Sequence, residues 1–338
     1  MLDAPLSPLQ RFLVSAAAAV VFLWGIRTAA PILNPFLIAI VLAYSLVPIP
    51  NLFIRRFGMS RWAAVALTVV VVAATELALI YVVGVSIADF KERLPVYQER
   101  FTALYNQVLD LLKAHGVEPS GVSLVKVLTP DRMLALSGSI LDAAGGFVSK
   151  GLVVLMLMVL LVVEMVEASK AEKARYHEAF RYYGGDVQRY VAITAGTGAL
   201  NALANLILML ALGVDFPFLW SILYFFMNFI PNVGFFLALL PPALLALVMH
   251  GWQRALAVAV GFVLTNAVVD NVVKPLFMKK GMDISLLTVV LSLVFWTFLL
   301  GATGAILAIP LTLASKKFVQ MRMEGAPVLG FQGDAGSS

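Results

Sequence analysis

Apolar residues occur along this chain in blocks long enough to cross a lipid bilayer, and short charged stretches separate them. The hydrocarbon core of a bilayer is about 30 Å thick and takes roughly 20 helical residues to cross. Six blocks have about that length, and two further blocks exceed 30 residues. The six predicted spans cover about 12–30, 32–50, 62–88, 147–167, 190–213 and 255–273.

Two features of these blocks bear on topology. The first two spans meet at Pro31, where we expect the chain to turn and form a helical hairpin. The two long blocks, Pro217 to Met249 and Ser285 to Ser315, are interrupted at Pro231–Gly234 and Gly301–Gly304. Roughly 33 residues make about 50 Å of helix, too long for one span and short for two. We therefore expect two re-entrant hairpins, because a helix break at membrane depth must be buried in protein or face a wet cavity.

Composition and charge agree with this interpretation. Hydrophobic residues make up 61% of the chain and charged residues 13%, which is typical of an integral membrane protein. The predicted fold class is therefore an all-α polytopic membrane protein. Lys and Arg concentrate on the cytoplasmic side of membranes, and re-entrant hairpins place Lys274, Lys279 and Lys280 there. Single spans would place them outside. The same rule puts both termini in the cytoplasm.

Several classes of function are disfavoured. The chain has no cysteine, which excludes thiolate metal sites and cysteine catalysis. Its net charge of +5 is small for a nucleic-acid-binding protein. The three histidines, His115, His177 and His250, form no His-Glu-x-x-His pair, and no Gly-x-Ser-x-Gly occurs. We expect neither an enzyme nor a bound cofactor or metal, and lipid as the surrounding partner.

The segment 89–146 differs from the rest and is expected outside the cytoplasm. Apolar residues recur in it at spacings of three and four, which predicts an amphipathic helix with an apolar seam. A second helix start is predicted at Thr129-Pro130-Asp131. The seam fits either a cap packed on the bundle or a contact between subunits, with similar weight. Its members are Phe90, Leu94, Tyr97, Phe101, Leu104, Val108 and Leu111.

These observations predict five regions. They are a scaffold of N-terminal helices (1–88), the extracytoplasmic segment (89–146), a fourth span with a cytoplasmic loop (147–189), a transport domain with both hairpins (190–317) and a disordered cytoplasmic tail (318–338).

A weak internal repeat relates the two hairpins. Gly213-Val214-Asp215 precedes the first and Gly281-Met282-Asp283 precedes the second, and each hairpin contains Gly-x-x-Leu-Ala, at Gly234 and at Gly304. Hairpins entering from opposite sides would form an inverted-topology repeat of the transporter type, although apolar low complexity also produces such matches. For Asp215 and Asp283, helix capping is favoured over solute contact.

Polar residues within the apolar blocks are the candidates for chemistry. Thr194, Thr197, Asn201 and Asn205 form one stripe on a helix face, which fits helix packing and a polar cavity equally well. Thr265, Asn266, Asp270, Asn271 and Lys274 lie at the end of a later span. Asp270 is either a functional carboxylate or the partner of Lys274 in an anchoring ion pair, and we favour function. The isolated Glu76 better fits a packing or interfacial role. The predicted solute and ion pathway comprises Asn201, Asn205, Asn228, Pro231, Asn232, Gly234, Asn266, Asp270, Asn271, Lys274, Gly301 and Gly304.

At these residues the chain resembles the autoinducer-2 exporter family, also called the PerM-type family. The resemblance lies in Asn228–Gly234 with Pro241-Pro242, in Asp270–Pro275, and in Gly304–Leu311, with Leu-Ser-Leu-Val-Phe-Trp between the last two. It implies a bacterial inner-membrane transporter that forms a homo-oligomer of five subunits and moves its hairpin domain in an elevator-like way. Members are associated with export of autoinducer-2, a quorum-sensing molecule, and some with sodium/proton antiport.

Two functions follow from these patterns. The first is export of a small polar solute coupled to H+ or Na+, which the neutral amides at Asn201, Asn205, Asn228 and Asn232 favour. The second is cation/proton antiport, for which Asp270 is the titrating acid. A scaffold protein would not need paired broken helices.

Overall fold

The computed structural model describes residues 7–46, 48–115, 146, 150–164, 170–231, 233–277 and 285–323. Regular structure in these ranges is helical throughout, and they contain no strand. The expectation of an all-α protein is therefore confirmed. Asn232, Asp283, the helix start at Thr129 and the tail beyond residue 323 lie outside the described residues.

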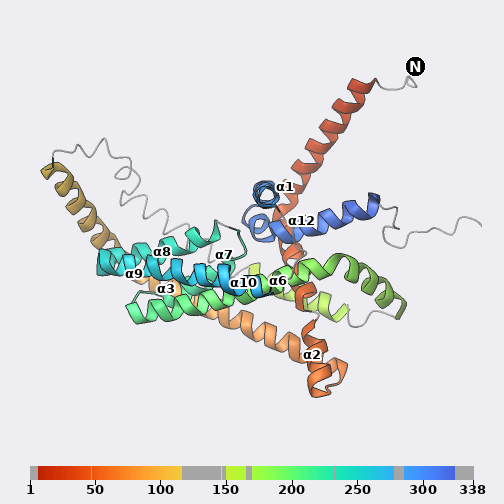
Figure 1. The fold of residues 1–338 in the computed structure, drawn as a ribbon, viewed down its shortest axis with the longest axis horizontal. Coiled ribbons are helices and arrows are strands. Elements are labelled where there is room, and N and C mark those ends of the chain that lie inside the picture. The colour runs from red at the N-terminus through yellow and green to blue at the C-terminus, as the bar shows by residue number, and fades with distance from the viewer. Residues whose placement is uncertain are drawn as a thin grey trace, which may run out of the picture. The chain divides into compact units, whose positions relative to one another are not determined.

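The chain divides into two compact units. Figure 1 shows its helices, coloured by residue number from red at the N-terminus to blue. Unit 1 comprises Met1–Pro48, Leu157–Val191 and Gly281–Ser338, and unit 2 comprises Ile49–Met156 and Ala192–Lys280. Each unit contains one of the two expected hairpins. The helix α6 (Lys170–Leu212) and the helical stretch 150–164 begin in one unit and end in the other.

Unit 1 is built on the long helix α1 (Pro8–Leu46), which packs against α11 (Leu286–Leu300) and α12 (Ala302–Met323). Ala30, Leu299 and Leu300 are its buried centre, and Ile26 and Leu37 pack around them. α1 is one helix of 39 residues, about 58 Å long, and it continues through Pro31 without a turn. The predicted hairpin at Pro31 is therefore wrong. Proline is tolerated in membrane helices that neighbouring helices support, and α11 packs on α1 on both sides of Pro31.

The second predicted hairpin is present in unit 1 as two helices joined by a single residue. Ser285 caps α11 by accepting a hydrogen bond from the Thr288 amide. At the other end Gly301 adopts φ 65° and ψ −144°, a conformation that favours glycine, and the chain enters α12 at once. The break predicted from Gly301 is confirmed. The chain turns back there, since α11 and α12 pack along each other.

Unit 2 contains the short helix α2 (Pro48–Phe57) and the helix α3 (Arg61–Ala114), whose first turn is capped by Ser60. The first predicted hairpin consists of α7 (Pro217–Met227) and α8 (Gly234–His250), which pack on each other and on α3. A turn at Gly251 leads into α9 (Trp252–Val268) along α8. The helix then continues through the π-helical turn η2 (Val269–Val273) into α10 (Lys274–Phe277). Trp220, Tyr224, Phe262 and Met209 are fully buried in the core of this unit.

The predicted amphipathic seam begins as a direct continuation of α3. Phe90 and Tyr97 are buried in the core of unit 2, with Leu94 packed beside them, so the first half of the seam contacts its own unit. Val108 and Leu111, farther along, are exposed. The cap interpretation therefore describes the first half, and a subunit contact stays a prediction for the second half.

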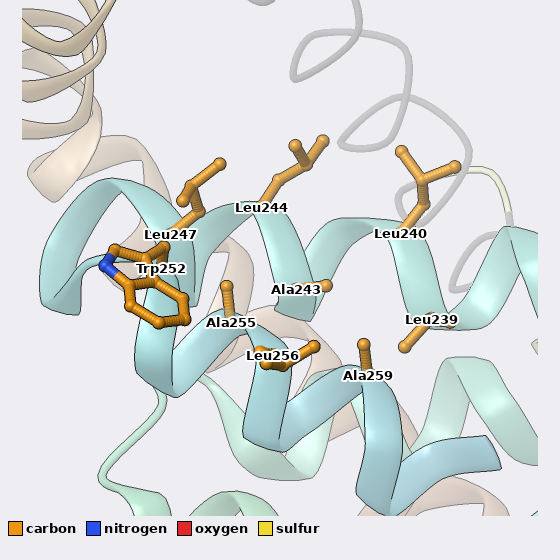
Figure 2. A pocket seen from close by; sticks show the side chains of 9 residues that line it. All are labelled: Leu239, Leu240, Ala243, Leu244, Leu247, Trp252, Ala255, Leu256 and Ala259. Carbon is orange, nitrogen blue, oxygen red and sulfur yellow. The ribbon is translucent and has the colours of Figure 1, made fainter.

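Four helical stretches in the described part of the chain are long and apolar enough to cross a membrane. They are Pro8–Phe57, Arg61–Ala114, Gly185–Leu212 and Trp252–Leu276. The shorter apolar helices α7, α8 and α11 belong to the hairpins. An apolar groove of about 480 Å³ runs between α8 and α9 (Figure 2), lined by leucines, alanines and Trp252. Apart from the Trp252 indole this groove is lined by aliphatic side chains, so a site for a polar solute has to be sought elsewhere in unit 2.

Candidate solute and ion site

The polar stripe on α6 faces the interior of unit 2. Thr194 and Thr197 are buried, and Asn201 and Asn205 have no exposed surface. The Thr197 hydroxyl donates to backbone carbonyls of its own helix, at Ile193 and Thr194. Asn201 and Asn205 lie about one and two helical turns beyond Thr197 on the same face, because residues four apart in a helix are neighbours. The predicted stripe thus lines an interior surface instead of facing lipid.

The two asparagine amides are incompletely paired. Within the described residues, neither the nitrogen nor the oxygen of the Asn201 amide has a hydrogen-bond partner, and the nitrogen of the Asn205 amide has none. The Asn205 oxygen accepts a hydrogen bond of 2.8 Å from the Thr265 hydroxyl on α9. A buried polar group without a partner costs about 1–3 kcal/mol. Such groups in a native fold call for a specific explanation, such as a bound ligand or water.

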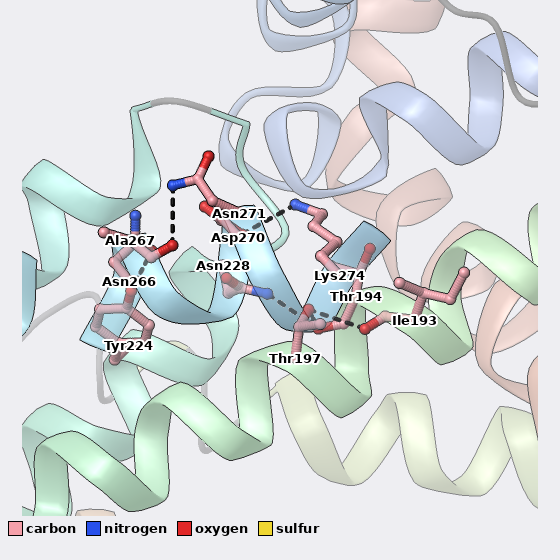
Figure 3. Close-up of polar contacts among 10 residues, drawn as sticks. All are labelled: Ile193, Thr194, Thr197, Tyr224, Asn228, Asn266, Ala267, Asp270, Asn271 and Lys274. Atoms are coloured by element: carbon pink, nitrogen blue, oxygen red, sulfur yellow. Dashed lines mark hydrogen bonds and ion pairs between the residues drawn. The ribbon is translucent and has the colours of Figure 1, made fainter. Parts of the chain in front are cut away.

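The tip of the first hairpin reaches this stripe. The Asn228 amide at the end of α7 donates a hydrogen bond of 2.9 Å to the Thr194 carbonyl (Figure 3). A Cβ atom on Gly198 would lie 3.0 Å from the Asn228 amide nitrogen, so glycine at this position lets the tip approach α6 closely. No local pattern distinguishes Gly198 from the other glycines, since the close approach depends on how the hairpin packs against α6.

Both hairpin tips depend on a glycine at or near the start of their second helix. A Cβ atom on Gly234 would overlap the Met227 carbonyl, and one on Gly304 would overlap the Trp296 carbonyl. Each glycine therefore lets the second helix of a hairpin pass against the backbone of the first. The predicted importance of both residues has a common steric origin, although Gly301 and Gly304 belong to unit 1 and Gly234 belongs to unit 2.

A hydrogen bond joins α7 and α9. The buried Tyr224 hydroxyl donates a hydrogen bond of 2.8 Å to the Asn266 side-chain oxygen. Tyr224 lies one turn before Asn228 on α7, so the same hairpin contacts α9 through Tyr224 and α6 through Asn228 (Figure 3). Tyr224 was not among the residues predicted from the sequence, and its position four residues before Asn228 was the signal that could have identified it.

Asp270 and Lys274 lie at an irregular part of the α9–α10 helix. The Lys274 amide donates to the Val269 carbonyl five residues earlier, which is the π-helical pattern. Pro275 has no N–H, so it cannot close the next α-helical hydrogen bond, and this favours the distortion. The Lys274 amine and an Asp270 oxygen are 3.3 Å apart, so the anticipated ion pair forms, in a partly exposed setting. Asn271 is exposed, and its amide donates to the Ala267 carbonyl of its own helix.

One capping prediction is wrong. Asp215 does not cap α7, whose N-terminal residue Phe216 has no side-chain cap. The Asp215 carboxylate instead accepts from Tyr97 at 3.0 Å and pairs with Arg93 at 3.3 Å, both on α3. Pro217 already occupies the first turn of α7, where its missing N–H needs no cap.

Asn34 is a further polar residue that was not predicted from the sequence. In unit 1 its amide nitrogen donates 3.0 Å to the Leu300 carbonyl at the end of α11. Because Gly301 breaks the helix there, this carbonyl has no partner in α11, and Asn34 supplies one. Its place between Pro31 and Pro35, in the middle of an apolar helix, was the available signal.

In chemical terms, unit 2 brings amides and hydroxyls from α6, α7 and α9 into one buried region, with a carboxylate and an amine on the adjacent η2–α10 turn. Neutral amides donate to and accept from hydroxyl and carbonyl oxygens of a solute. In the described residues, no group of three or more His, Cys, Asp or Glu side chains could hold a metal ion.

The sequence model described as AI-2E family transporter matches residues 13–323. The chain is 28% identical over 324 residues to the "AI-2 transport protein TqsA" of Escherichia coli (strain K12), covering 94% of both proteins. It is also 28% identical over 320 residues to a protein of Haemophilus influenzae, covering 91% of this chain and 92% of the relative. The similarity to YhhT of Escherichia coli (strain K12) is 27% over 327 residues, covering 94% and 92%.

Proposed function

The chain belongs to the AI-2E transporter family, and from this membership we propose that it exports a small polar solute, with autoinducer-2 as the first solute to test. The chain is a multi-pass membrane protein, and the proposed location is the bacterial inner membrane with both termini in the cytoplasm. The proposal includes alternating access by an elevator-like movement, assembly as a homo-oligomer of five subunits, and coupling to H+ or Na+.

The observation that carries this proposal is the pair of buried, incompletely paired amides at Asn201 and Asn205. The unpaired atoms comprise two N–H₂ donors and one oxygen. A metal cation would satisfy only the oxygen, whereas a hydroxyl-bearing solute accepts from the donors and donates to the oxygen. The balance of unpaired atoms therefore favours a neutral, oxygen-rich solute over a bare ion at this position.

The broken hairpins support alternating access. Interrupted helices near the middle of the membrane are common at transporter binding sites. The tip of the first hairpin contacts the α6 stripe through the Asn228–Thr194 hydrogen bond, so a small displacement of the tip would uncover Thr194 and its neighbours. The inverted repeat remains part of the proposal, and the matching roles of Gly234 and Gly304 support it.

A second candidate function is sodium/proton antiport, which the Asp270–Lys274 pair favours. This carboxylate lies on a π-helical turn, a feature found frequently at functional sites. A carboxylate near the membrane interior that exchanges its amine partner for a proton or a cation would supply the coupling step.

The experiment that separates the two functions uses proteoliposomes. Uptake of the autoinducer-2 precursor and sodium-driven proton movement are measured in parallel for the wild type and for Asp270→Asn. We expect saturable solute flux in the wild type, with a pH dependence that Asp270→Asn abolishes while the oligomer stays intact. Sodium-driven proton movement without solute flux would establish the antiporter, and an unchanged pH dependence in Asp270→Asn would exclude Asp270 as the proton site.

A further inference from the structure

The entrance to the first hairpin is held by α3 through an unusual concentration of contacts. The carboxylate of Asp215 accepts from the Tyr97 hydroxyl at 3.0 Å and pairs with Arg93 at 3.3 Å. The Asp215 backbone carbonyl accepts from the Trp220 indole at 3.0 Å. One residue thus connects α3 to the first turn of α7 through both its side chain and its backbone.

The next residue, Phe216, has a strained backbone. Its φ of 57° and ψ of 46° lie in the left-handed region, which residues other than glycine, asparagine and aspartate rarely adopt. The Phe216 ring is held by its neighbours, with centroids 5.4 Å from Phe90 and 6.3 Å from Tyr97, and the Arg93 guanidinium is 5.9 Å from it. Strain of this kind persists only where the surrounding contacts fix the conformation.

α7 connects the turn at Phe216 directly to the hairpin tip, so a rotation of the backbone at this turn would move the tip. Gly213 at φ 66° and Phe216 at φ 57° bracket the turn between α6 and α7, so both ends of this turn have left-handed backbone. From Pro217 the helix runs 11 residues, about 16 Å, to the tip at Asn228. A cavity of about 360 Å³ beside the turn, lined in part by Ser86, Asp89 and Phe218, leaves room for it to move.

We infer that Asp215 is the anchor of the first hairpin, and that Arg93 and Tyr97 are positioning residues that hold the hairpin tip against the Thr194 stripe. The three residues act through the backbone at Phe216 and do not contact the solute. Releasing the carboxylate lets Phe216 relax, turns α7 about Gly213–Phe216 and lifts Asn228 from α6. This role is separate from the proposed solute and holds whichever solute the protein carries.

The test uses the absence of native cysteines. A single Thr194→Cys reporter, buried beneath the Asn228 tip, is reconstituted in proteoliposomes, and its rate of reaction with a small methanethiosulfonate reagent is measured. We expect the rate to rise about tenfold in Tyr97→Phe and in Asp215→Asn, because each removes a hydrogen bond involving a charged carboxylate. Arg93→Gln should raise it about threefold, since this ion pair is partly exposed.

Two controls separate positioning from a general loss of structure. Arg100→Gln removes the same charge from an exposed position on α3 and should leave the labelling rate unchanged. The double variant Arg93→Gln with Asp215→Asn should label no faster than Asp215→Asn alone, because both changes release the same anchor. Thr197→Cys serves as a second buried reporter if Thr194→Cys does not fold.

Unchanged labelling in both Tyr97→Phe and Asp215→Asn would overturn the inference. Because the readout is thiol reactivity and not flux, it is independent of the solute. Absence of solute flux with faster labelling would refute the proposed export and support the anchoring role of Asp215. Normal flux with unchanged labelling would support export and refute the anchoring role.

Discussion

The two broken hairpins share a backbone design and differ in what surrounds it. Each consists of an apolar helix, a sharp break, and a second helix whose glycine passes against a carbonyl of the first, Gly234 at Met227 and Gly304 at Trp296. The first hairpin ends in a tip of several residues and contacts the Thr194 backbone carbonyl on α6 and the Asn266 side-chain oxygen on α9. The second turns at Gly301 alone, and α1 holds its end through Asn34 and through Arg27, whose guanidinium is 4.6 Å from the Phe298 ring.

This difference separates a structural requirement from a chemical one. The steric need for glycine is the same in both units, so it follows from folding back a helix and not from binding. Among the described residues, three atoms of the buried Asn201 and Asn205 amides lack partners beside the first hairpin, whereas the second hairpin lies beside one such amide atom, the Asn34 oxygen. In the second hairpin, a polar contact joins its own two helices: the Trp296 indole on α11 donates a hydrogen bond of 2.9 Å to the Thr312 hydroxyl on α12. Solute recognition is therefore expected at the first hairpin and a supporting role at the second.

The largest effect should come from adding a methyl group at either tip. Gly234→Ala and Gly304→Ala each place a Cβ atom on a backbone carbonyl, which cannot move away as a side chain can. We expect each to lower the free energy of unfolding in detergent by about 3 kcal/mol or more. Gly196→Ala, where a Cβ meets nothing within 4 Å, is the matched control and should be neutral or slightly stabilising. Tolerance of alanine at one tip alone would show that the two hairpins do not share this design.

The next effect distinguishes recognition from packing at the first hairpin. Asn201→Leu replaces an unpaired amide by an apolar side chain of similar size, so we expect solute flux to fall about tenfold or more while stability stays equal or rises by about 1 kcal/mol. Flux in proteoliposomes and thermal unfolding in detergent measure the two quantities. Asn106→Leu, at an exposed position on α3, controls for the substitution itself. Lower stability with unchanged flux would make the stripe a packing element.

At the second hairpin the same kind of substitution should have the opposite signature. Asn34→Leu leaves the Leu300 carbonyl without its partner, and we expect unfolding to become easier by about 1–2 kcal/mol. Flux per folded protein should stay within about twofold of the wild type, since Asn34 supports the end of α11. A flux loss comparable to that of Asn201→Leu, at normal stability, would place part of the recognition site in unit 1.

The sequence predicted the features that depend on neighbouring residues. Glycine and proline break helices locally, so the interruptions near Pro231 and at Gly301 were predictable, and the spacing from Thr194 to Asn205 placed four polar residues on one face. Contacts between distant helices were not predictable in this way. Asn34 meets Leu300 across 266 residues and Arg93 meets Asp215 across 122, and neither pairing leaves a local pattern. The turn expected at Pro31 failed because the neighbouring helix α11, and not the proline alone, determines whether α1 bends.

The smallest effects are expected from two matched variants, each of which removes one hydroxyl group. Tyr224→Phe removes the donor to Asn266, and Thr312→Val removes the acceptor of the Trp296 indole. Each leaves one polar atom without its partner, so both should lower the free energy of unfolding by about 1 kcal/mol. Only Tyr224→Phe frees an amide beside the α6 stripe, and we expect it alone to raise the KM for solute flux, by about twofold to threefold. Equal changes in KM for both variants would mean that flux follows overall stability, and the chemical distinction between the two hairpins would then be lost.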